Sequence, residues 1–140
     1  MEIKTLLEQR GLLIFDGAMG TQLQAKGLKT GETPELLNLT AKDLLKEIHR
    51  SYIDAGADII SANTFGANSY KLSHSGKSVD EIITAGIINC KEAIKESGKD
   101  VFCALDIGPI GQLLEPTGSL KFEDCLLYTS PSPRDRSVSR

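Results

Sequence analysis

The stretch Leu12-Leu13-Ile14-Phe15-Asp16-Gly17-Ala18-Met19-Gly20-Thr21 is the strongest indication of the fold. Its first four residues are all apolar, and an Asp-Gly pair follows them directly. A short, uniformly apolar run is typical of a strand that is buried on both faces, as the strands of parallel sheets are. The sequence therefore predicts a buried strand over residues 12–15 that ends in a polar, glycine-containing turn.

Two later segments repeat this pattern and alternate with helices. Residues 57–61, which are Ala-Asp-Ile-Ile-Ser, and the apolar residues 101–105 are candidates for two further buried strands, and each segment is followed by a polar or glycine-rich turn. Helical spacing of apolar residues predicts helices over 41–54 and from Val79 to Gly98. Repeated βα units of this kind indicate an α/β domain with parallel strands. A doubly wound open sheet and the start of a (β/α)8 barrel both fit the pattern, and periodicity does not separate them.

The remaining segments are set apart by glycine, proline and polar residues. Apolar side chains at positions 3, 6 and 7 predict a short helix that ends before Gly11. Residues 28–40 predict a long loop, after which Thr40 caps the next helix. From residue 125 the sequence becomes rich in Ser, Pro and Arg and loses its periodicity. We therefore predict a domain over residues 1–124 and a disordered tail over 125–140, which looks like a translated sequencing or assembly artefact.

The composition argues against several classes of function. The chain has 140 residues with 16 Lys+Arg and 19 Asp+Glu, which gives a net charge of −3. Without a basic cluster it lacks the positive face that nucleic acids and anionic membranes require of a partner. No apolar run approaches the roughly 20 residues of a membrane-spanning helix, and the N-terminus does not resemble a signal peptide. We expect a cytoplasmic protein that has neither nucleic acid nor membrane as a partner.

The turn after the first predicted strand is the best candidate for chemistry. Asp16 is expected at the carboxyl end of that strand, and the small residues Gly17, Ala18 and Gly20 let a ligand approach the backbone. Free N–H groups where the next helix starts, near Thr21, suit a carboxylate, whereas Asp16 suits an ammonium group. This combination fits an amino acid. The alternative is that Asp16 caps the helix and that the glycines only form the turn.

The turns after the other two strands are expected at the same edge of the sheet. Asn63 and Thr64 are candidates to hydrogen-bond a polar substrate, and Phe65 is a candidate for an apolar wall of the site. Asp106 adds an acidic residue after the third strand. The alternatives are a capped polar turn after the second strand and a purely structural Gly-Pro turn after the third.

The histidines and cysteines are weaker candidates. His49 and His74 have no partner at metal-ligand spacing, so we expect both on the solvated surface. Cys90 lies on an apolar helical stripe and Cys103 within a predicted strand, where thiols usually pack as small apolar groups. Three cysteines at wide spacing also make a disulfide framework improbable on sequence grounds.

Several of these motifs, taken together, resemble the homocysteine S-methyltransferase family. They occur in the expected order as Leu13-Ile14-Phe15-Asp16-Gly17-Ala18-Met19-Gly20-Thr21, Pro34-Glu35-Leu36-Leu37-Asn38, Ile48-His49-Arg50-Ser51-Tyr52, Ala55-Gly56-Ala57-Asp58-Ile59-Ile60, Asn63-Thr64-Phe65-Gly66-Ala67 and Asp106-Ile107-Gly108-Pro109. The resemblance covers residues 1–124 and is strongest to the N-terminal homocysteine-binding module of cobalamin-dependent methionine synthases.

The resemblance implies a (β/α)8 TIM barrel, of which this chain holds about three βα units, and an enzyme that methylates homocysteine to methionine. In the family, a zinc ion held by three cysteine thiolates binds the substrate thiol and removes its proton. By position, the resemblance implies that Asp16 holds the substrate ammonium and that the backbone around Gly17 and Ala18, together with Thr64, holds its carboxylate. It implies that Phe65 shapes the pocket.

Cofactors and methyl donor follow only from the resemblance. None of Cys90, Cys103 and Cys125 matches a family zinc position, so we expect the zinc ligands to lie outside this chain and the chain alone to be inactive. The expected methyl donor is methylcobalamin or methyltetrahydrofolate on further modules. S-methylmethionine and betaine are the alternative donors, and a non-catalytic module that binds a small amino acid is the alternative from another functional class.

Overall fold

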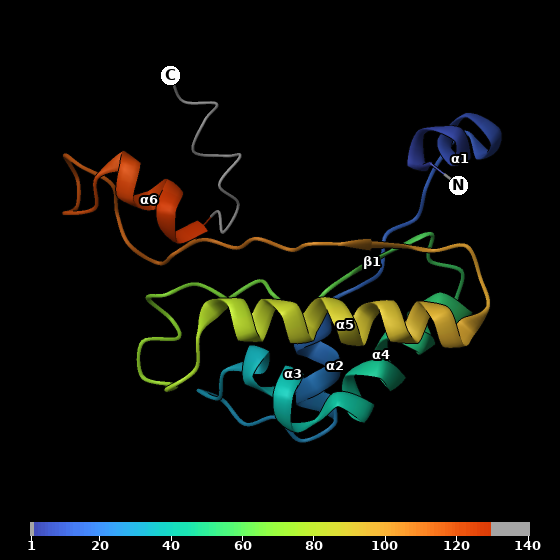
Figure 1. The fold of residues 1–140 in the computed structure, drawn as a ribbon, viewed down its shortest axis with the longest axis horizontal. Coiled ribbons are helices and arrows are strands. Elements are labelled where there is room, and N and C mark those ends of the chain that lie inside the picture. The colour runs from blue at the N-terminus through green and yellow to red at the C-terminus, as the bar shows by residue number, and fades with distance from the viewer. Residues whose placement is uncertain (1, 130–140) are drawn as a thin grey trace.

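The computed structural model describes residues 2–129, and Figure 1 shows how its helices are arranged about a short sheet, with α5 running along it. The elements in chain order are α1 (Ile3–Arg10), α2 (Met19–Ala25), the 3₁₀ turn η1 (Pro34–Leu36), α3 (Leu37–Thr40), α4 (Lys42–Asp54), β1 (Ile59–Ser61), α5 (Val79–Ser97), β2 (Phe102–Ala104) and α6 (Phe122–Thr129).

The strands form a small parallel sheet. β1 pairs with β2 in parallel, with Ile59 opposite Phe102. On its other edge Ile59 forms a parallel bridge to Phe15, where Asp16 N donates to Ile59 O at 2.9 Å and Ile59 N donates to Ile14 O at 3.1 Å. The predicted α/β class with parallel strands is therefore confirmed, and the three apolar segments lie side by side.

The first predicted strand is wrong in two respects. It is reduced to the single bridge at Phe15, and the side chains of Leu12, Ile14 and Phe15 are 60%, 54% and 58% exposed instead of buried on both faces. In Figure 1, α2 to α5 lie on one side of the strands and α1 and α6 on the other. The first segment lies at the edge of the sheet, so it has few described neighbours that bury its side chains.

The main core lies between the sheet and α4 and α5. Ile53 of α4, Ile60 of β1 and Cys90 of α5 are all 0% exposed and pack in one cluster. Full burial of an Ile side chain contributes about 1.5–3 kcal/mol. Two further clusters join α2 to α4 and the loop after β1 to the start of α5. The sheet is thus packed together with α2, α4 and α5, and this packed unit fixes where the strands end.

The predicted helices are confirmed, together with most of their ends. Gly11, in the left-handed region at φ 77°, ends α1, and Gly98 at φ 65° ends α5. Ser78 Oγ accepts a hydrogen bond from Glu81 N at 3.1 Å, as the capping box predicts. None of the helices described between residues 2 and 129 combines the length and the apolar character needed to cross a membrane.

The loop predicted over 28–40 is wrong in its second half, where η1 and α3 form. Pro34 begins η1, because its fixed φ suits the first position of a helical turn. Thr40 does not cap α4, since Ala41 holds that position without a side-chain cap. Thr40 ends α3 instead, and its Oγ1 donates to Leu36 O at 3.3 Å.

The helix α6 crosses the predicted boundary at Asp124. The disorder predicted from Cys125 is wrong for residues 125–129, which continue this helix. Leu126 and Leu127 are good helix formers, and the first helix-breaking residue of the tail is Pro131. Residues 130–140 lie outside the described residues, so the rest of that prediction, including the artefactual origin, stays a prediction.

Candidate functional site

A small cavity lies where the parallel strands end. Its volume is about 170 Å³. Three segments line it: the turn after the first apolar segment, the end of β1 with its following loop, and the turn after β2. The first segment contributes Phe15, Asp16, Gly17, Ala18 and Met19, the second contributes Ser61, Ala62, Asn63, Thr64 and Phe65, and the third contributes Asp106. The carboxyl ends of parallel strands are where α/β proteins commonly bind ligands. The predicted meeting of the three turns is confirmed.

Asp16 is half-buried at this cavity and is held by Ser61. Its Oδ2 accepts from Ser61 N at 2.9 Å, and its Oδ1 accepts from Ser61 Oγ at 3.0 Å. Burial raises the pKa of Asp16 above its usual value, against the opposing effect of these hydrogen bonds. The alternative role as a helix cap is wrong, because Ala18 holds the N-cap position of α2 and makes no side-chain hydrogen bond. Each carboxylate oxygen keeps a lone pair for a ligand donor.

Asp106 brings a second carboxylate to the same cavity. It follows β2 and lines the space that Asp16 also lines. Its negative charge adds to the rise in the pKa of Asp16, because two like charges in a partly desolvated space repel each other. The cavity is therefore electrostatically suited to a cationic group such as an ammonium.

Gly17 and Ala18 form a backbone wall of the cavity, but the glycine also makes room for a neighbouring side chain. A Cβ at Gly17 would lie 2.9 Å from Tyr52 Oη, and this hydroxyl donates to Ala18 O at 3.2 Å. Thr21 is exposed on α2 and is not among the lining residues. Thr21 therefore does not belong to this cavity, and its predicted contact with the substrate stays a prediction.

Asn63 lines the cavity, but its amide group is used inside the protein. The residue is 5% exposed, and its Nδ2 donates to Pro34 O at 2.8 Å and to Asn38 Oδ1 at 3.0 Å. Asn38 Nδ2 in turn donates to Asn63 O at 2.8 Å and to Ile82 O at 3.1 Å, and Asn89 Nδ2 donates to Asn38 O at 2.9 Å. The geometry favours a supporting role for Asn63 over the predicted hydrogen bond to the substrate.

Thr64 and Phe65 connect the loop after β1 with the turn after β2. Thr64 Oγ1 donates to Asp106 O at 2.8 Å and accepts from Asp106 N at 3.2 Å, while Gly108 N donates to Phe65 O at 3.0 Å. The Phe65 side chain is 51% exposed, and Lys71 Nζ lies 5.5 Å from the centre of its ring, within cation–π range. Phe65 is thus an apolar wall of the cavity, and the Thr64 hydroxyl joins the two loops.

Sequence reasoning did not identify Glu35, which supports this loop without lining the cavity. Glu35 is 5% exposed, and its carboxylate accepts a hydrogen bond from Gly66 N at 2.6 Å. It stands in the motif 34–38, which indicates the family but not the role of this residue. An acidic residue beside Pro34 looks like an ordinary solvated loop residue, so the sequence gives no local signal of its burial.

His49 differs most from its prediction. It is 0% exposed instead of solvated, and within the described part of the chain neither ring nitrogen has a hydrogen-bond partner. Burial lowers its pKa to about 4.

His74 is exposed, and Cys90 is buried in the core, both as predicted. The thiol of Cys103 beside it, together with burial, raises the pKa of Cys90.

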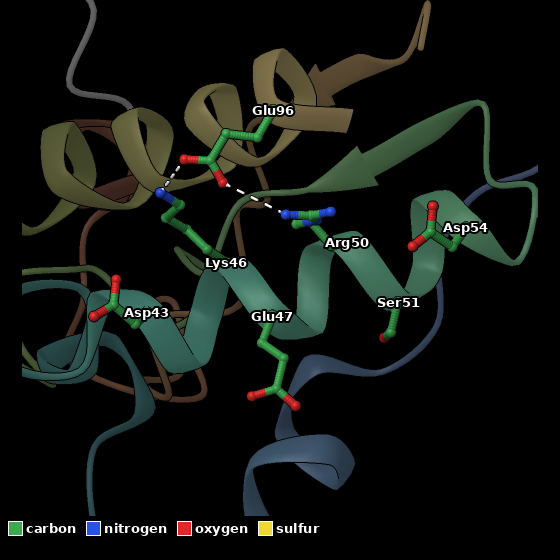
Figure 2. A pocket seen from close by; sticks show the side chains of 7 residues that line it. All are labelled: Asp43, Lys46, Glu47, Arg50, Ser51, Asp54 and Glu96. Carbon is green, nitrogen blue, oxygen red and sulfur yellow. Dashed lines mark hydrogen bonds and ion pairs between the residues drawn. The ribbon is translucent and has the colours of Figure 1, made fainter. Parts of the chain in front are cut away.

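A second, polar groove of about 460 Å³ lies between α4 and α5, and Figure 2 shows the side chains that line it. Lys46 and Arg50 of α4 point toward Glu96 of α5, whereas Glu47 points away. Lys46 forms an ion pair with Glu96, and Arg50 Nη1 lies 3.9 Å from the same carboxylate. Opposite charges that pair with one another at the surface are typical of a solvated helix face, so the groove is the weaker candidate site.

Comparison with known proteins places the chain in a family. The family model for homocysteine S-methyltransferase matches residues 13–132. The chain belongs to the homocysteine S-methyltransferase family. It is 45% identical over 73 residues to the methionine synthase of Mycobacterium tuberculosis and 47% identical over 68 residues to that of Mycobacterium leprae. These matches cover 48% and 44% of this chain, and 6% of each relative's length.

Solved structures of one protein share the fold. The metallated form of the homocysteine methyltransferase MmuM from Escherichia coli matches with a TM-score of 0.70 at 22% identity, over 78% of this chain and 42% of that one. Its apo form matches with a TM-score of 0.59 at 23% identity, over 80% of this chain and 41% of that one. At such identities the likeness establishes a common fold and no more.

Proposed function

We propose that this chain forms the part of a homocysteine S-methyltransferase that binds the amino-acid end of homocysteine. The observation that carries the proposal is the cavity at the strand ends, where Asp16 and Asp106 line the same space as the apolar side chains of Met19 and Phe65. A zwitterion with a short carbon chain needs both kinds of surface. Membership of the family supports homocysteine as that zwitterion.

The roles of the residues follow from their contacts. Asp16 holds the substrate ammonium, because its oxygens keep free lone pairs and its carboxylate is fixed by Ser61. The backbone around Gly17 and Ala18 holds the substrate carboxylate. Thr64, whose hydroxyl is already bonded to Asp106, keeps the two loops together. Phe65 excludes water from the carbon chain.

We further propose that the three parallel segments belong to a (β/α)8 TIM barrel. The sheet order, the turns that meet at the strand ends and the fold shared with MmuM support this. In a closed barrel every strand edge is paired, and such packing would bury the apolar side chains that are exposed on residues 12–15.

The described residues do not fit the zinc centre that the family resemblance implies. Between residues 2 and 129, no three His, Cys, Asp or Glu side chains are grouped so as to hold a metal ion. Cys90 is buried in the core with its pKa raised, which disfavours the thiolate form that binds zinc. The proposal therefore assigns zinc to none of these residues.

The methyl donor is proposed from sequence similarity. We assign methylcobalamin or methyltetrahydrofolate as the donor, as the family resemblance implies. The identities of 45% over 73 residues and 47% over 68 residues to two methionine synthases support this choice.

Titration of the isotope-labelled chain with L-homocysteine, followed by NMR, tests the proposal. We expect the backbone signals of Asp16, Ser61 and Asp106 to shift, and we expect Asp16→Asn to weaken binding about 10-fold through the lost ion pair. Asp100→Asn removes the same charge from an exposed position outside the cavity, so it should bind like the unmodified chain. Equal affinities of the two variants, or shifts that avoid the cavity, would contradict the proposal.

A further inference from the structure

The segment Pro34–Asn38 does not line the cavity, yet it makes several buried contacts with the loop that does. Glu35 Oε1 accepts from Gly66 N at 2.6 Å, and Asn38 Nδ2 donates to Asn63 O at 2.8 Å. Glu35 is 5% exposed and Asn38 is 2% exposed. These two bonds hold the main chain of the loop after β1 on both sides of Thr64 and Phe65.

The glycines around this loop indicate that the contacts are close on every side. A Cβ at Gly66 would lie 2.7 Å from Glu35 Oε1, and a Cβ at Gly86 of α5 would lie 2.8 Å from Asn38 Nδ2. A Cβ at Gly108, in the turn after β2, would lie 2.4 Å from Phe65 O. Since Cβ contacts below 3.0 Å are essentially never observed, a side chain at any of these positions would force a neighbouring group to shift, and at Gly108 that group is the main chain of Phe65 itself.

The burial of the Glu35 carboxylate, at 5% exposure, is unusual for an acidic residue. A buried carboxylate loses its hydration, and this costs free energy unless hydrogen bonds replace the water. The bond to Gly66 N is charge-assisted and therefore stronger than a bond between neutral groups. The carboxylate thus fixes one peptide of the loop in one position, and that peptide directly follows Phe65.

We propose that Glu35 and Asn38 are positioning residues that set Thr64 and Phe65 at the mouth of the substrate cavity. The inference rests on the proposed function, because it takes the cavity as the binding site for homocysteine. Neither residue contacts the substrate. Both act through the main chain of Asn63–Gly66, so their loss widens the positions that Phe65 adopts without removing any group that binds the ligand.

The test compares Glu35→Ala with Glu35→Gln in the 140-residue chain. We expect Glu35→Ala to weaken L-homocysteine binding about 10-fold, the lower end of what the loss of a supporting residue costs at metal sites. Glu35→Gln keeps an oxygen acceptor for Gly66 N–H, so its affinity should stay within about 3-fold of the unmodified chain. Leu6→Ala serves as a matched destabilised control, because Leu6 is buried on α1 and does not line the cavity. It should lower the melting temperature and leave the affinity unchanged.

A ligand-free measurement separates this inference from the proposed function. Backbone amide hydrogen exchange at Thr64, Phe65 and Gly66 should accelerate in Glu35→Ala and return toward normal in Glu35→Gln. If the unmodified chain binds no homocysteine, the proposed function fails while the exchange data still decide whether Glu35 holds the loop. Exchange that is unchanged at these residues in Glu35→Ala, or a loss of affinity in Leu6→Ala as large as in Glu35→Ala, would overturn the inference.

Discussion

The buried His49 makes the stability of the protein sensitive to mild acid. Its pKa falls from 6.5 to about 4 on folding, because both ring nitrogens lie in the core without a hydrogen-bond partner among the described residues. Between these two values the unfolded chain takes up a proton and the folded chain does not. Lowering the pH therefore favours unfolding, and this destabilisation begins as the pH falls through 6.5.

The size of the effect follows from the difference in pKa. A difference of about 2.5 units between the two pKa values, at about 1.4 kcal/mol per unit, gives roughly 3 kcal/mol of lost stability once the pH is below 4. At pH 5 the same two pKa values give a loss of roughly 2 kcal/mol relative to pH 7 or above. This is a large fraction of the 5–15 kcal/mol by which domains are ordinarily stable.

Urea denaturation followed by circular dichroism at pH 7, 6 and 5 measures this loss. His49→Leu fills a similar volume without a titrating group, so the variant should lose about 2 kcal/mol less between pH 7 and pH 5 than the unmodified chain. It should also be more stable at pH 7, because unsatisfied buried polar groups cost about 1–3 kcal/mol. The exposed His74 offers the control His74→Leu, which should keep the full pH dependence. Parallel curves for His49→Leu and the unmodified chain would refute the reasoning.

Two further predictions concern stability. Gly86→Ala should destabilise the fold by about 1–3 kcal/mol, because its Cβ would lie 2.8 Å from Asn38 Nδ2. Gly20→Ala, in open space on α2, should instead stabilise the fold by up to about 1 kcal/mol. Chemical denaturation of both variants measures these two changes in the free energy of unfolding. Asp58→Ala should cost about 1.5–3 kcal/mol, since Asp58 is 4% exposed and its carboxylate accepts from Ile14 N at 2.9 Å, while its partner Arg10 has a side chain that is 54% exposed and stays solvated. Thermal melts check the second prediction, and a melting temperature unchanged within error would contradict it.

The sequence predicted that the three turns meet, but it did not predict that Glu35 and Asn38 hold one of them in place. Asp16, Thr64 and Asp106 each follow an apolar segment, and parallel strands bring such positions to one edge. Glu35 and Asn38 gave no comparable signal, because their partners Gly66 and Asn63 lie more than one element away along the chain. Pairings of that kind depend on how α3 packs on α5, which no local pattern encodes.

The sequence by itself determined the α/β class, the parallel strands, the ends of α1 and α5 and the family. These follow from local periodicity, from caps and glycines, and from motifs that are read in order along the chain. Only the tertiary structure decided that His49 is buried, that Thr21 lies outside the cavity and that Asn63 bonds to Asn38 instead of facing a ligand with its amide. A side chain's environment depends on which elements pack beside it, and this is a long-range property that a residue's own neighbours in sequence do not fix.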